Sequence, residues 1–135
     1  MNDVCKILIL CVDDEKCVLR SLERLFIDQD NYEVVTALSA SEALEILEHQ
    51  GAFKVVISDY RMPVMNGLEF LKAVKERWSE TVRLVLSGYA DSAEIQYALN
   101  NGLIYKVVTK PWNIDELLAT VASALEYYEL QRKVS

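Results

Sequence analysis

The chain has 135 residues, of which 52% are hydrophobic, enough to bury the core of one compact domain without disulfide bonds or a structural metal. Its formal net charge of −7, from 21 acidic and 14 basic residues, argues against direct binding to nucleic acid or to an anionic membrane. The three cysteines lack zinc-site spacing and no apolar run could span a bilayer, so we expect free thiols, no membrane segment and a cytoplasmic location.

Five short apolar segments have the length and composition of β-strands. The first, Ile7–Val12, is apolar at consecutive positions, which is typical of a strand covered on both faces in a parallel sheet. The second, Tyr32–Ala37, is interrupted by polar residues, so we expect it nearer an edge. The other three strands are predicted at residues 55–58, 82–86 and 105–109.

A segment with helical character follows each predicted strand. Apolar residues recur at helical spacing over residues 16–26, and the last helix is expected from about Asn113. A capping residue followed three positions later by Glu opens the three helices between them, at Ser39 and Glu42, Asn66 and Glu69, and Asp91 and Glu94. This regular alternation predicts an α/β fold, a mostly parallel sheet with helices on both faces.

Polar and charged residues follow four of the predicted strands. They are Asp13 and Asp14 after the first strand, Asp59 after the third, Ser87 after the fourth and Lys110 after the fifth. Because ligands of such sheets bind outside the carboxyl ends of the strands, we expect these side chains to lie close together. Three carboxylates on one rim would repel one another, which favours a hard divalent cation there, Mg²⁺ or Mn²⁺.

These residue types can together perform phosphoryl chemistry. Asp59 can accept a phosphoryl group as an acyl phosphate, while Lys110 pairs with a phosphoryl oxygen and the Ser87 hydroxyl donates to one. Taken singly, each has a plainer role: Asp59 and Ser87 as turn residues, Asp14 as a helix cap and Lys110 as a solvated charge. Compatible groups at four strand ends favour a phosphoryl and metal site.

Four motifs stand in order at these strand ends: Val12-Asp13-Asp14-Glu15, the stretch 59–67 (DYRMPVMNG), Leu86-Ser87-Gly88 and Thr109-Lys110-Pro111-Trp112. As an ordered set they resemble the receiver domain of bacterial two-component response regulators, and the resemblance covers nearly the whole chain. It implies a flavodoxin-like, CheY-like sheet of five parallel strands in the order 2-1-3-4-5, with five helices. A single receiver domain would span residues 1–135, with 126–135 as a possible connector to an output domain.

The resemblance also implies a role for each acidic residue. Asp59 would be phosphorylated by a sensor histidine kinase or a phosphotransfer protein, and Lys110 would contact the phosphoryl group. Mg²⁺ would be held by Asp14, Asp59 and the backbone carbonyl of Arg61, with Asp13 orienting bound water. The chain would be a signalling module, not an enzyme, catalysing only its own phosphotransfer and dephosphorylation.

Further positions carry implied roles in switching. Ser87 would move toward the phosphoryl group, the Lys110–Pro111 bond would be cis, and Arg61 and Tyr89 would modulate dephosphorylation. The last helix, the fifth strand and the helix before it would form a partner or homodimer face. Residues 105–112 resemble receivers joined to HD-GYP phosphodiesterases or to transcriptional activators.

One position departs from the pattern of the family. Many receivers have a Tyr or Phe three residues before the lysine that rotates inward on activation, and this chain has Val107. A valine cannot make that movement. Switching would then use Ser87 and loop movement alone, or another aromatic residue such as Tyr105 or Tyr89 would substitute.

Three other functions fit parts of the sequence. A haloacid-dehalogenase-like phosphatase needs Asp-x-Asp, and the chain has Asp13-Asp14-Glu15. A flavin or nucleotide module needs a loop rich in Gly, Ser and Thr, where an acidic loop would repel phosphate. A receiver that acts without phosphorylation would not need the complete set of site residues. Each alternative is less consistent with the strand ends than a phosphorylatable receiver.

Overall fold

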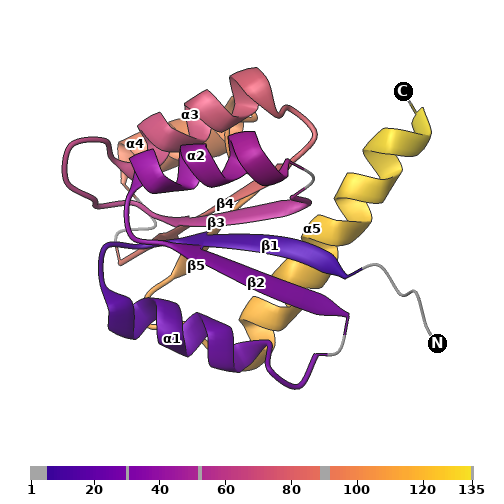
Figure 1. Cartoon of the computed structure of the whole chain (residues 1–135). Helices are drawn as coiled ribbons and strands as arrows, with labels where there is room; N and C mark the ends of the chain where they lie inside the picture. The colour runs from indigo at the N-terminus through magenta and orange to yellow at the C-terminus, as the bar shows by residue number, and fades with distance from the viewer. Residues whose placement is uncertain (1–5, 30, 52, 89–91, 135) are drawn as a thin grey trace.

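Parallel strands form the centre of the computed structural model, which describes residues 6–29, 31–51, 53–88 and 92–134 (Figure 1). Within these residues the elements are β1 (Ile7–Val12), α1 (Lys16–Leu25), β2 (Tyr32–Ala37), α2 (Ala40–Gln50), β3 (Val55–Asp59), α3 (Gly67–Arg77), β4 (Val82–Ser87), α4 (Ala93–Asn100), β5 (Lys106–Thr109) and α5 (Ile114–Val134). The strands pair in parallel in the order β2-β1-β3-β4-β5, which confirms the predicted topology.

The helices cover both faces of the sheet, with α1 and α5 on one side and α2, α3 and α4 on the other (Figure 1). Alternate residues of each strand point to opposite faces. In β1, Ile9 and Cys11 therefore belong to the core cluster beneath α1 and α5, while Leu10 and Val12 belong to the cluster beneath α2, α3 and α4. Burial on both faces explains why β1 and β3 are apolar at consecutive positions.

Side-chain caps fix where the helices begin. The predicted capping box of α3 is present, because Asn66 Oδ1 accepts from the Glu69 amide at 2.9 Å and Glu69 Oε1 accepts from the Asn66 amide at 3.0 Å. Before α2, Ser39 Oγ accepts from the Glu42 amide at 3.1 Å, while the Glu42 carboxylate accepts from Leu38, one residue before the cap. Both helices thus start where their caps predicted.

The α4 and strand boundaries differ in detail from the sequence prediction. The cap of α4 is Ser92, whose Oγ accepts from the Ile95 amide at 3.3 Å, and Asp91 lies outside the described residues. Asp59 and Ser87 are the last residues of their strands and do not follow them, because Asp59 still pairs with Leu86, and Ser87 with Thr109. The strand backbone itself therefore holds these two site residues.

The second half of α5 runs past the sheet and is held to the body by charged contacts. Lys54 Nζ donates to Glu129 Oε2 at 2.9 Å, and Arg132 Nη1 donates to Glu80 Oε1 at 2.8 Å. Figure 1 shows α5 extending beyond the sheet toward the C-terminus. None of the helices in the described part of the chain combines the length and the apolar character that crossing a membrane requires.

Candidate functional site

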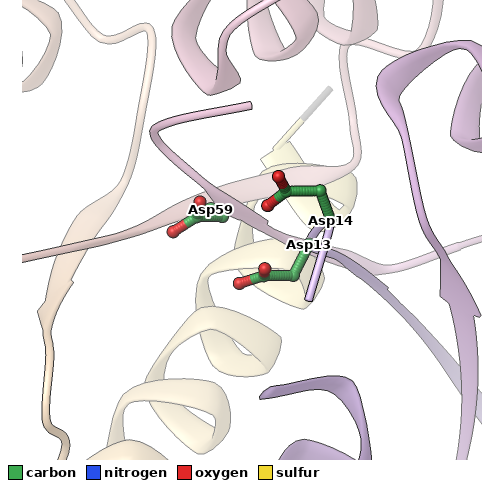
Figure 2. Close-up of side chains that lie close together, drawn as sticks. All are labelled: Asp13, Asp14 and Asp59. Atoms are coloured by element: carbon green, nitrogen blue, oxygen red, sulfur yellow. The ribbon is translucent and has the colours of Figure 1, made fainter. Parts of the chain in front are cut away.

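Three carboxylates meet at the carboxyl edge of the sheet, contributed by the ends of β1 and β3 (Figure 2). Ligand oxygens of Asp13, Asp14 and Asp59 all lie within 4.8 Å of one another. Asp13 is fully buried and Asp59 nearly so, while Asp14 is exposed to solvent. The predicted convergence of the three carboxylates is therefore present, with two of them buried and Asp14 open to solvent.

Lys110 reaches this acidic edge from the end of β5. Its Nζ donates to Asp59 Oδ1 at 2.6 Å and to Asp13 Oδ2 at 3.2 Å, and its amide donates to the Ser87 carbonyl at 3.0 Å. Burial alone would lower the pKa of Lys110, but the hydrogen bond to Asp59 and the charges of Asp13 and Asp59 together raise it. The ammonium group thus stays charged and offsets part of the carboxylate repulsion.

Opposing effects act on the pKa of the Asp13 carboxyl group, and the net result is a rise. Burial raises the pKa of its carboxyl group, and the nearby charge of Asp59 raises it further. The Glu15 amide, which donates to Asp13 Oδ1 at 2.9 Å, and the charge of Lys110 act in the opposite direction. A net rise means that ionised Asp13 is costly in this position unless more positive charge is supplied.

The donor set fits a hard divalent cation. Mg²⁺ prefers carboxylate, carbonyl and water oxygens and is commonly held by one or two carboxylates together with substrate oxygens. Three carboxylates close enough to share one ion, with Asp13 carrying a raised pKa, provide that chemistry. Arg61, two residues beyond Asp59, lies in the loop that follows β3 and could contribute its backbone oxygen.

The remaining predicted site residues lie around this centre. Ser87 is buried at the end of β4, and the Arg61 side chain is exposed. The Lys110–Pro111 peptide bond is cis, as the resemblance implied. Tyr89 lies outside the described residues.

Two neighbours of Asp59 were not identified from the sequence as site residues. Gly67, the first residue of α3, packs directly on the end of β3, and a Cβ there would overlap the Asp59 carbonyl oxygen. Tyr60 donates its hydroxyl to Glu94 Oε1 of α4 at 2.5 Å. This bond is the main cause of the raised pKa of Tyr60. In the sequence, only the Asn66-Gly67 pair indicates a special backbone position, and it concerns the contact of Gly67.

Val107 and Tyr105 lie on opposite faces of the sheet. Val107 is half-buried in β5, pairs with Val85 and packs on the cluster beneath α2, α3 and α4. Tyr105 faces α5, where its hydroxyl is 2.7 Å from Ser123 Oγ and its ring stacks on Tyr127 at 4.8 Å between centroids. Tyr105 is thus engaged with α5 and lies on the other face from Val107.

Known sequences similar to this chain include transcriptional regulators. The model of the response regulator receiver domain family matches residues 9–122. The hydrogenase transcriptional regulatory protein HoxA of Cupriavidus necator is 43% identical over 123 residues, which are 91% of this chain and 25% of HoxA. The chain therefore spans about a quarter of the length of this relative.

Solved structures agree over almost the full length of the chain. The signal receiver domain of an HD domain-containing protein from Pseudomonas fluorescens Pf-5 has a TM-score of 0.87 and 31% identity, covering 98% of this chain and 96% of that one. Chemotaxis protein CheY4 of Vibrio cholerae has a TM-score of 0.81 and 32% identity, covering 90% and 100%. Strand order, acidic edge and similarity all lead to the same family.

Proposed function

Because this chain belongs to the response regulator receiver domain family, as its motifs predicted, we propose that Asp59 is its phosphoryl acceptor. Phosphorylation of an aspartate is the general function of that family. The observation that supports Asp59 is its position between the Lys110 ammonium group, 2.6 Å away, and the carboxylates of Asp13 and Asp14. It is a buried strand-end carboxylate that lies beside the exposed Asp14.

We propose that Asp13, Asp14, Asp59 and the Arg61 carbonyl together hold Mg²⁺ or Mn²⁺. The ion supplies charge neutralisation on the phosphoryl oxygens during transfer. A carboxylate oxygen of Asp59 forms the new bond to phosphorus, and the phosphorus–nitrogen bond of a phosphohistidine donor breaks. The imidazole leaves with the electron pair and gains a proton.

Lys110 and Ser87 then bind the product. Lys110 is close enough to exchange its contact with Asp59 for a phosphoryl oxygen, and Ser87, at the adjacent strand end, donates its hydroxyl to another. Hydrolysis by water attacking phosphorus returns Asp59 to a carboxylate and releases phosphate. Arg61, and Tyr89 in the part of the chain not described, would modulate this step by controlling access of water.

The length of HoxA suggests that this chain works together with a further domain. HoxA is a transcriptional regulatory protein about four times longer than the matched segment, so we propose that an output domain follows α5 in the full protein. The phosphoryl donor would be a sensor histidine kinase or a phosphotransfer protein, and α4, β5 and α5 would form a face for a partner or a homodimer. A cytoplasmic location stays a prediction.

The acceptor assignment can be tested with acetyl phosphate and Mg²⁺. The intact mass of the wild type should rise by one phosphoryl group, and Asp59→Asn should abolish the increase. Asp28→Asn, an exposed aspartate far along the chain from the strand ends, is the matched control and should be modified like the wild type. An unmodified wild type, under conditions that modify another receiver, would overturn the proposal.

A further inference from the structure

Tyr60 connects the acceptor strand with α4. Its amide donates to the Leu86 carbonyl at 2.9 Å, and its carbonyl accepts from the Gly67 amide at 2.8 Å, so its backbone is fixed between β4 and α3. Its side chain extends toward α4, where its hydroxyl donates to Glu94 Oε1 at 2.5 Å. Glu94 lies in the first turn of α4. One side chain therefore joins the residue after Asp59 to the first turn of α4.

Other aromatic side chains near the site make different contacts. Tyr105 faces α5, and Trp112 packs on the cluster beneath α1 and α5. The half-buried Val107 has neither a ring nor a hydroxyl. Among these residues, all in the described part of the chain, only Tyr60 makes a side-chain hydrogen bond to α4.

The contacts of Asp59 identify which arrangement this link belongs to. Lys110 Nζ lies 2.6 Å from Asp59 Oδ1, a contact that a phosphoryl group on Asp59 would replace. The Tyr60–Glu94 bond thus coexists with the contact made by the free carboxylate. Movement of Ser87 toward a phosphoryl group would shift the start of α4, since the Ser92 cap is only five residues further along the chain. Tyr60, held by its backbone, would not follow.

We infer that Tyr60 is a positioning residue whose hydrogen bond to Glu94 holds α4 in the arrangement of the unphosphorylated domain. The inference rests on the proposed phosphorylation of Asp59. Since the bond is made in one arrangement and weakened in the other, it biases the equilibrium between them. Removing it should increase the fraction of molecules in the arrangement that favours phosphorylation, and hence the rate of phosphorylation.

The test compares initial rates of phosphorylation by acetyl phosphate with Mg²⁺ in Tyr60→Phe, Glu94→Ala, which removes the acceptor oxygen, and the double variant. Tyr60→Phe removes only the hydroxyl and keeps the ring that packs on the core. We expect each single variant to react about fivefold faster than the wild type, given the strength of a partly exposed hydrogen bond to a carboxylate. The double variant should react no faster than either single one, because both remove the same bond.

Tyr97→Phe is the matched control, because Tyr97 lies on α4 with its side chain 71% exposed, and its rate should equal that of the wild type. A rate in Tyr60→Phe within about twofold of the wild type, or additive effects in the double variant, would overturn the inference while leaving Asp59 as the acceptor.

A wild type that acetyl phosphate does not modify would contradict the proposed function instead. The effect of the Tyr60–Glu94 hydrogen bond on α4 is then tested by amide hydrogen exchange without a phosphodonor. Faster exchange in the first turn of α4 in Tyr60→Phe, with Tyr97→Phe unchanged, would support it. Equal exchange in Tyr60→Phe and the wild type would overturn it.

Discussion

Gly67 offers a test of how tightly the acceptor strand is packed. A Cβ at this position would overlap the Asp59 carbonyl oxygen and lie 2.9 Å from Tyr60 Cα, so backbone must move to accommodate Gly67→Ala. In a helix without this contact, replacing Gly with Ala would stabilise by roughly 0.5–1 kcal/mol. Overpacking against backbone costs about 1–3 kcal/mol and here outweighs that gain. We therefore expect Gly67→Ala to lower the free energy of unfolding by about 2 kcal/mol.

Urea unfolding followed by circular dichroism measures this difference. Gly88→Ala is the matched control, because a Cβ at Gly88 would meet no atom within 4 Å, and its stability should stay within about 0.5 kcal/mol of the wild type. The same shift of the Asp59 backbone should slow phosphorylation of Gly67→Ala. A Gly67→Ala protein as stable as the wild type would show that the acceptor strand and α3 are not packed as described.

Other predictions concern charge, thiols and backbone strain. The raised pKa of Asp13 means that the folded protein binds its proton more tightly than the unfolded chain, so ionised Asp13 costs stability above about pH 4. Asp13→Asn should therefore be more stable than the wild type at pH 7, with the difference shrinking in acid and on adding Mg²⁺ to both; equal unfolding midpoints at pH 7 would refute this. Burial raises the pKa of Cys11 to about 12, so N-ethylmaleimide should label the exposed Cys17 and reach Cys11 only after unfolding; peptide mapping that finds equal labelling in the native protein would contradict the burial. Val64 has a φ of 71° and an exposed side chain, so Val64→Asn should stabilise by about 1 kcal/mol in urea unfolding, and a loss of stability would argue against the left-handed conformation.

The order of elements and the edge that carries the site could be predicted from sequence, because both depend on local patterns. Consecutive apolar residues such as those of β1 identify buried parallel strands, and ligand groups in such sheets gather at the carboxyl ends. Asp13, Asp59 and Lys110 follow from these two rules alone, and the structure brings them into contact. The capping pair Asn66 and Glu69 likewise depends on a spacing of three residues.

What the sequence could not predict depends on contacts between distant residues. The Tyr60–Glu94 bond joins the end of β3 to α4, and no periodicity links these two positions. The need for glycine at position 67 comes from the approach of α3 to the β3 backbone, which only the packed fold determines. Val64 in the left-handed region runs against its residue type, so propensity would have excluded the conformation it adopts.

The central claim is that Asp59 carries the phosphoryl group, and site-specific chemistry tests it most directly. Borohydride reduces an aspartyl phosphate to homoserine, which tandem mass spectrometry locates in the sequence. After treatment with acetyl phosphate and Mg²⁺, the wild type should contain homoserine at position 59 and at no other aspartate. Homoserine at Asp13 or Asp14, or none in protein whose mass shows the phosphoryl group, would contradict the account.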